Sequence, residues 1–140
     1  MALIQLVYVS SMVGDDESQL GAILEDAVKY NDKNGITGML LYTRGNFIQV
    51  LEGPPDSVHH TYARICLDPR HQAVTFLSEA QVEQRHFSAW SMGYKRLSPA
   101  DLAAFPEYDN LFNFETQPKR VDGQASLALE MLTMFSDGLI

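Results

Sequence analysis

The pattern of apolar and polar positions in the first third of the chain predicts a strand, a helix and a hairpin. Residues 3–10 alternate and are rich in β-forming side chains, which is typical of a strand. Asn34-Gly35 then stops a helix, and residues 36–43 and 47–53 form a hairpin. The helix itself is indicated by apolar residues at helical spacing, namely Leu20, Ile23, Leu24, Ala27 and Val28.

The next part of the chain repeats this order of elements. Pro54 and Pro55 begin a second helix, whose apolar stripe holds Val58, Tyr62 and Ile65. Residues 73–84 and 90–97 are predicted strands, and Ser98-Pro99 begins a short helix. The order β-α-β-β-α-β-β, with two helices on one face of a sheet, predicts an α+β fold of the ferredoxin-like type.

The C-terminal part has a different character. Residues after 105 look like a loop, and residues 126–135 then predict a helix with Leu127, Met131, Met134 and Phe135 on one stripe. That stripe must pack either on the open face of the sheet or on a partner protein. We expect it to pack on the sheet, because a sheet with helices on one face has a second face that needs to be covered. The sequence thus divides into a core of residues 1–97 and a C-terminal helical extension, 98–140.

Composition narrows the class of protein. The 140 residues suit one domain, and a formal net charge of −8 argues against direct nucleic-acid binding. No segment approaches the roughly 20 apolar residues that span a bilayer, and the N-terminus lacks the basic start of a signal peptide. Cys66 is the single cysteine and is expected to be a small buried hydrophobe. These features predict a cytoplasmic protein without membrane contact.

Standard catalytic and metal-binding motifs are missing from the sequence. The four histidines have no metal-ligand spacing, so no metal site is expected. There is no Gly-rich phosphate loop and no nucleophile elbow. Acylphosphatase-like hydrolysis on this fold would need an arginine in the first loop, which here is acidic, "SSMVGDDES".

A glutamine in the third strand is the most unusual feature. Gln49 shares a face with Phe47 and Leu51, and the charge on Glu52 suggests that the other face is partly wet near its end. We therefore expect Gln49 to point inward, towards the helices. A buried amide without partners costs about 1–3 kcal/mol, and Tyr8 is a candidate partner if the first and third strands are neighbours. Such a bond would equally suit a purely structural role.

Other polar positions leave two interpretations open. Gly38 admits either a close ligand or close strand packing. Arg64, Asp68, Arg70 and His71 gather around one turn, as ligand contacts or as a surface ion pair. Trp90 and Met92 share one face of the last strand and suit the core.

Five segments together resemble a known family. They are "LVYVS", "NGITGMLLY", "FIQVLEGP", "DPRH" and "FSAWSMGY", in this order. The chain resembles BLUF domains, bacterial blue-light sensors that use flavin, over residues 3 to about 97. The resemblance implies a core that holds FAD between its two helices, with FMN or riboflavin as alternatives.

The resemblance also implies roles for individual residues. Tyr8 matches the photoactive tyrosine, Gln49 the switching glutamine, and Asn31 the asparagine that bonds the ring's carbonyl side. Tyr30 departs from the polar residue that relatives often carry. Further cofactor contacts fall on Ile23, Phe47 and Ile65 along the ring, and on Lys29, Arg64, Asp68, Arg70 and His71 at its polar parts; Trp90 and Met92 lie where one of them approaches the glutamine.

The implied activity is photosensory rather than enzymatic. Electron and proton transfer from tyrosine to an excited flavin would rotate or tautomerise the glutamine, and the changed hydrogen bonds would shift absorption to the red. The resemblance to short members implies signalling to a separate partner protein and assembly into homo-oligomers. The alternatives are a flavin-free ligand-binding regulatory module and a small flavin reductase.

Overall fold

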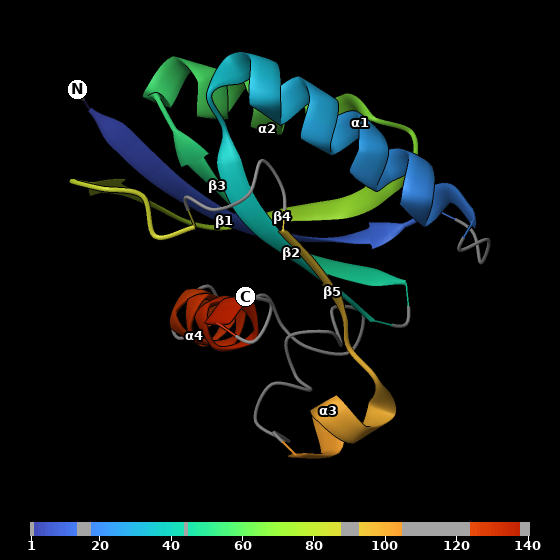
Figure 1. Cartoon of the computed structure of the whole chain (residues 1–140). Helices are drawn as coiled ribbons and strands as arrows, with labels where there is room; N and C mark the ends of the chain where they lie inside the picture. Colours follow the sequence, from blue (N-terminus) through green and yellow to red (C-terminus); the bar gives the residue numbers. More distant parts are fainter. Residues whose placement is uncertain (1, 14–17, 44, 88–92, 105–123, 138–140) are drawn as a thin grey trace.

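The computed structural model describes residues 2–13, 18–43, 45–87, 93–104 and 124–137. One mixed sheet lies between a pair of helices and a single C-terminal helix (Figure 1). The elements are β1 (Leu3–Met12), α1 (Ser18–Asn34), β2 (Thr37–Thr43), β3 (Asn46–Gly53), α2 (Pro55–Leu67), β4 (His71–Val82), β5 (Gly93–Arg96), α3 (Pro99–Ala104) and α4 (Gln124–Asp137). No helix of the described ranges is long and apolar enough to cross a bilayer.

The strand order explains how the chain closes its core. The five-stranded sheet has the order β4-β1-β3-β2-β5. β1 is antiparallel to both β3 and β4, β2 and β3 form the hairpin, and β5 runs parallel to β2. With α1 and α2 on one face, this arrangement confirms the expected ferredoxin-like α+β fold.

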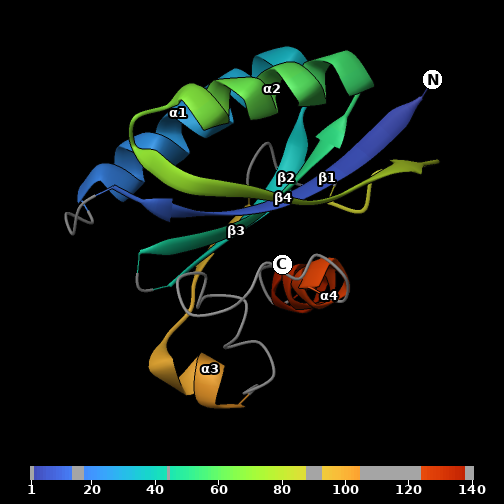
Figure 2. The same cartoon turned by 180° about the vertical axis from the view of Figure 1, so that it is seen from behind.

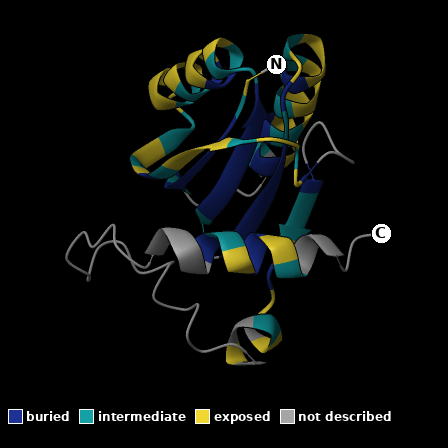
Figure 3. Cartoon of the chain, turned by 90° about the vertical axis from the view of Figure 1, so that its left-hand side faces the viewer, coloured by how far each residue is buried: buried dark blue, intermediate teal, exposed yellow. Residues whose placement is uncertain are grey.

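The strands β1, β2 and β3 are buried on both faces of the sheet, so alternate residues of each enter different cores. Along β1, Tyr8 faces the helix pair, whereas Val7 and Val9 face the opposite side. Figure 2 shows the two layers from behind, and Figure 3 shows buried strands between the partly exposed helices. The face towards α1 and α2 is the one that can offer side chains to a ligand between those helices.

Helix α4 covers the second face. Ala128, Met131 and Leu132 are buried there with Val7 and Ile48 of the sheet, and Met134 packs at the margin. The side chains of Leu127 and Phe135, which complete the expected stripe, lie outside the described part of the chain. The division into residues 1–97 and 98–140 stays a prediction.

Several element boundaries follow local chemistry. Ser98 and Asp101 cap α3 reciprocally, because each backbone N–H donates to the other side chain. β4 begins at His71, two residues before the predicted start. β5 falls inside the predicted 90–97 strand, whose first three residues are not described.

Two burial expectations were wrong. Cys66 is exposed, because one step beyond Ile65 turns a helical side chain by about 100° away from the apolar stripe. Glu52 is fully buried rather than wet. Its carboxylate accepts hydrogen bonds from Gln5 and from the backbone that follows β4, so the end of this face is covered by chain and not by solvent.

The structure favours the packing role for Gly38. A Cβ at this position would collide with the backbone carbonyl oxygen of Val50 on the neighbouring strand. Gly38 does not line the cleft between the helices described below. The glycine therefore permits close approach of β2 and β3.

Gly38→Ala is expected to lower the free energy of unfolding by about 1–3 kcal/mol, because the backbone of β3 must shift. Gly21→Ala is the matched control: nothing lies within 4 Å of the added Cβ in α1, and alanine favours a helix by about 0.5–1 kcal/mol. Chemical denaturation measures both. A Gly38→Ala protein as stable as the original would contradict the close approach.

Candidate functional site

A cleft opens between α1 and α2 above the middle of the sheet. Its floor is formed by Leu40 of β2 and Gln49 of β3, and its end by the turn between α2 and β4. The remaining lining residues are Ile23, Asp26, Ala27, Tyr30 and Asn31 of α1, Thr61, Arg64 and Ile65 of α2, and Asp68, Arg70 and His71. Aliphatic walls from both helices thus face each other, with the Gln49 amide at the floor, the Asn31 amide on the α1 wall and charges at the end.

Tyr8 and Gln49 are joined by a hydrogen bond below this cleft. The register of β1 and β3 places them directly opposite each other. The buried Tyr8 hydroxyl donates to Oε1 of Gln49, whose side chain is also buried. Gln49 lines the cleft and Tyr8 does not, so the amide lies between the phenol and the cleft.

The surroundings of Tyr8 keep its phenol neutral. Burial is the main cause that raises the pKa of Tyr8 well above its ordinary value of 10.0, and Tyr62 is the largest electrostatic contributor. The Tyr62 ring lies 5.3 Å from that of Tyr8, and burial raises the pKa of Tyr62 to about 12. The proton of Tyr8 therefore stays on the oxygen and remains available to Gln49.

A charged cluster closes the end of the cleft. The Arg70 guanidinium donates to both carboxylate oxygens of Asp68, and its Nη1 donates to Asp26 of α1 at 2.9 Å. Hydrogen bonds from Arg70 lower the pKa of the Asp68 carboxyl below its ordinary value of 3.8. The cluster ties α1 to the turn after α2, so it sets the distance between the two helices at this end.

His71 lies behind this cluster. Its Nδ1 is 3.1 Å from Oγ of Ser10, and its ring is 5.1 Å from that of Phe47. Burial lowers the pKa of His71 below its ordinary value of 6.5, and the negative charge of Asp68, which raises this pKa, offsets only part of the effect. His71 is therefore favoured in its neutral form, in which one ring nitrogen donates and the other accepts.

Arg64 and Tyr30 form one side of the cleft. The guanidinium carbon of Arg64 lies 3.7 Å from the centre of the Tyr30 ring, a cation–π contact between α2 and α1. Tyr30 also stacks with His60 at 6.5 Å. The resemblance implied a polar residue at position 30, whereas the structure places the Tyr30 ring in the cleft wall, where its contact orients Arg64.

The structure brings most of the residues implied by the resemblance to one place. Eight of them line the cleft: Ile23, Asn31, Gln49, Arg64, Ile65, Asp68, Arg70 and His71. Phe47 is buried beneath, between the rings of Tyr42 and His71. Lys29 is on the outer side of α1, where its exposed ammonium pairs with Glu25 at 3.1 Å. Trp90 and Met92 lie outside the described residues.

Five lining residues were not predicted from the sequence: Asp26, Ala27, Leu40 and Thr61, and Tyr30 as a wall contact. The helical spacing of Ile23, Ala27 and Asn31 would have indicated the inner face of α1. No local sequence pattern indicates a role for Asp26 in the cleft, because its partner Arg70 is 44 residues away. Among the described residues, no group of three or more His, Cys, Asp or Glu side chains is placed to hold a metal ion.

The burial of His71 predicts a dependence of stability on pH. Its pKa is lower in the folded chain than in the unfolded one, so its contribution is fully present above pH 6.5 and is lost as pH falls through that value towards the folded pKa. The free energy of unfolding should fall between about pH 8 and about pH 5. His71→Gln should flatten this decline, measured by urea titration at each pH, whereas His60→Gln at an exposed position should leave it. An unchanged slope in His71→Gln would contradict the prediction.

Comparison with known proteins identifies the family. The model for "BLUF: Sensors of blue-light using FAD" matches residues 3–93. Photoactivated adenylate cyclase subunit beta of Euglena gracilis is 35% identical over 113 residues, which are 79% of this chain and 13% of that protein. The blue light- and temperature-regulated antirepressor BluF of Escherichia coli is 34% identical over 92 residues, 64% of this chain and 23% of that protein. The chain thus spans a small part of the length of these relatives.

Solved structures of similar size give the same result. BlsA in its photo-activated state superposes with a TM-score of 0.77 at 28% identity, over 94% of this chain and 95% of that one. The dark-state structure of the BLUF protein BlrB gives a TM-score of 0.70 at 27% identity, over 91% and 96%. Fold, cleft and sequence agree: the chain belongs to the BLUF family of blue-light sensors that use flavin.

Proposed function

We propose that the chain senses blue light through the hydrogen bond between Tyr8 and Gln49, with FAD as the flavin held in the cleft. The observation that carries this proposal is the position of Gln49. Its amide accepts from a buried, neutral phenol on one side and lines the cleft on the other. A ligand in the cleft whose affinity for electrons or protons changes would act on this amide directly.

The donor set of the cleft fits a flavin. Ile23 and Ile65 offer apolar walls from opposite helices, which suits a flat ring. Asn31 and Gln49 offer amides that both donate and accept, and Arg64 adds donors in a planar fork. A flavin held there would supply absorption of blue light and, once excited, an acceptor for one electron.

Tyr8 is the electron and proton donor in this proposal. A phenol that loses an electron becomes a strong acid, so its proton leaves along the hydrogen bond that already exists. That bond leads to Oε1 of Gln49, which is the only acceptor that the structure gives the Tyr8 hydroxyl among the described residues. Burial of both side chains keeps water from taking the proton instead.

Gln49 converts this transfer into a changed hydrogen-bond pattern. An amide has chemically different ends, and rotation or tautomerisation exchanges its donor and acceptor sides. One exchanged hydrogen bond amounts to about 0.5–1.5 kcal/mol. Such a small energy can only shift an output element that is already nearly balanced. Trp90 and Met92 are proposed to take part in that response.

We further propose that the signal passes to a separate partner protein, and that the chain works in the cytoplasm as a homo-oligomer. The names of the relatives support an effector outside the sensing module, since they describe an adenylate cyclase and an antirepressor. The formal net charge of −8 argues against nucleic acid as the direct partner. We propose a sensory role, not an enzymatic one, for this chain.

Absorption spectra of the purified protein before and after blue illumination test the proposal. A flavin spectrum with a small, reversible red shift is expected, without bleaching and without turnover of an added reductant. Mass spectrometry of the released cofactor is expected to give FAD. A colourless protein would favour a flavin-free module, and lasting bleaching with consumption of reduced nicotinamide would favour a reductase.

Tyr8→Phe is expected to abolish the red shift while flavin stays bound, because the hydroxyl donor is lost and the ring is kept. Gln49→Leu should do the same, since leucine neither donates nor accepts. Tyr62→Phe is the matched control, because it removes a hydroxyl from the neighbouring ring and leaves the Tyr8–Gln49 bond intact. A normal shift in Tyr8→Phe would remove Tyr8 from the mechanism.

A further inference from the structure

Glu52 is a buried carboxylate that the light-sensing site does not use. It lies three residues after Gln49 on β3, on the face turned away from the cleft, and its exposed fraction is 0%. Its oxygens accept from Nε2 of Gln5 at 2.9 Å and from the backbone N–H groups of His86 and Phe87 at 2.9 and 2.7 Å. These three donors are uncharged, so they hold the carboxylate through hydrogen bonds.

Such a residue is costly at this position. Taking a carboxylate out of water has an effective penalty of several kcal/mol, and the neighbouring Ile48 and Val50 on the same face are aliphatic. An aliphatic side chain at position 52 would pack there without that penalty. The carboxylate therefore matters for what it binds, which is the chain that follows β4.

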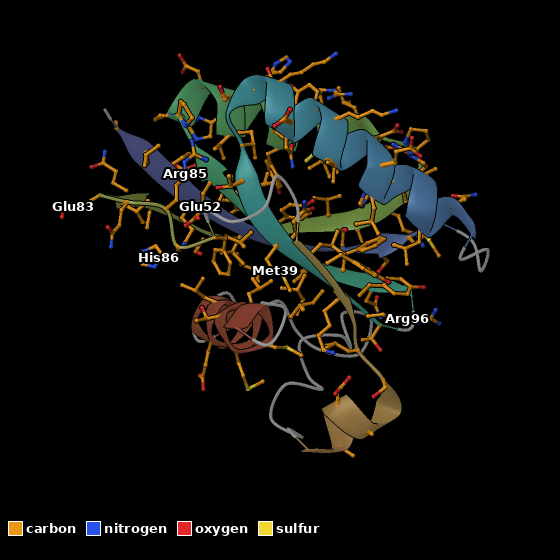
Figure 4. The ribbon with its side chains drawn as sticks, in the orientation of Figure 1. Met39, Glu52, Glu83, Arg85, His86 and Arg96 are labelled. Carbon is orange, nitrogen blue, oxygen red and sulfur yellow. The ribbon has the colours of Figure 1, made fainter. Side chains whose placement is uncertain are left out.

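That chain crosses the sheet. β4 and β5 occupy opposite edges, so the residues after Val82 must pass from one edge towards the other. Arg85 fixes this crossing at a second point: its guanidinium donates to Oγ1 of Thr37, to the carbonyl of Glu52 and to the carbonyl of Gly35. Figure 4 shows Glu52, Arg85 and His86 at the end of the sheet away from Arg96.

Phe87 connects this crossing to the C-terminal helix. Its N–H makes the shortest of the hydrogen bonds to Glu52, and its side chain is 1% exposed. The Phe87 ring belongs to the same buried cluster as Met131 and Leu132 of α4. A path therefore runs from Gln49 along β3 to Glu52, through the carboxylate to Phe87, and from the Phe87 ring through this buried cluster to α4, alongside the direct packing of β3 against α4.

We propose that Glu52 is the positioning residue that couples β3 to α4. A displacement of β3 at Gln49 moves the carboxylate, the carboxylate moves the Phe87 backbone, and the Phe87 side chain changes its packing in the cluster that it shares with α4. The inference rests on the proposed function, because the displacement begins at the light-responsive amide. It adds the route by which a change on one face of the sheet reaches the helix on the other face.

Glu52→Leu separates coupling from sensing. Leucine has no oxygen, so it cannot accept from Gln5 or from the crossing backbone, while its side chain suits the aliphatic surroundings of Ile48 and Val50. The site around Tyr8 and Gln49 is unchanged. We expect a red shift of normal size, and a light-induced change in amide hydrogen exchange of α4 that is reduced by about fivefold or more, the lower end of typical coupling between sites.

Two further variants make the comparison specific. Glu83→Leu is the matched control: it removes a carboxylate from an exposed position on the same crossing, and both responses should stay normal. Glu52→Gln is the conservative variant: its amide oxygen accepts from the backbone N–H groups of His86 and Phe87, and its amide nitrogen donates to Gln5 once the Gln5 amide presents its oxygen. It should keep most of the α4 response.

The unmodified protein provides a measurement that does not depend on how a variant folds. Light should change the exchange of the His86 and Phe87 amides together with that of α4. A response of α4 without any change at these two amides would overturn the proposal, as would a normal α4 response in Glu52→Leu. Loss of the red shift in the unmodified protein would instead count against the proposed function, so the two failures are distinguishable.

Discussion

The antiparallel register of β1 and β3 sets Tyr8 directly across from Gln49, and the rest of the site depends on this alignment. Side chains alternate between faces along a strand, so a slip of one residue would move Tyr8 to the α4 face and leave the buried amide without its donor. Burial of β1 and β3 on both faces fixes their register, because each of these strands has two apolar sets that must enter two different cores.

The same alternation separates sensing from output. Gln49 points to the cleft between α1 and α2, whereas Glu52 points to the α4 side and holds the chain that crosses the sheet. A single strand of eight residues thus presents an amide to one layer and a carboxylate to the other. Both side chains are buried and hydrogen-bonded, so a small movement of the strand changes hydrogen bonds within the protein and not hydrogen bonds to solvent.

Much of the architecture could be predicted from the sequence because it rests on local periodicity. The stripe from Leu20 to Val28 gave α1, and the alternation of residues 3–10 gave β1. The expected strand order made Tyr8 a candidate partner of Gln49, and the resemblance to the family gave both residues a role in one site. Predictions based on single residues were weaker: Cys66 was expected inside and is exposed, and Glu52 was expected to be wet and is fully buried.

The sequence by itself determined the elements, their order and which face of each element is apolar, since these follow from spacing along the chain. Tertiary structure alone decided which distant groups meet the charged residues. Asp26 meets Arg70 across 44 positions, and Glu52 meets the Phe87 backbone across 35. A charged residue has no local pattern that reveals its partner, because its burial is compensated by groups that only folding brings within hydrogen-bond distance.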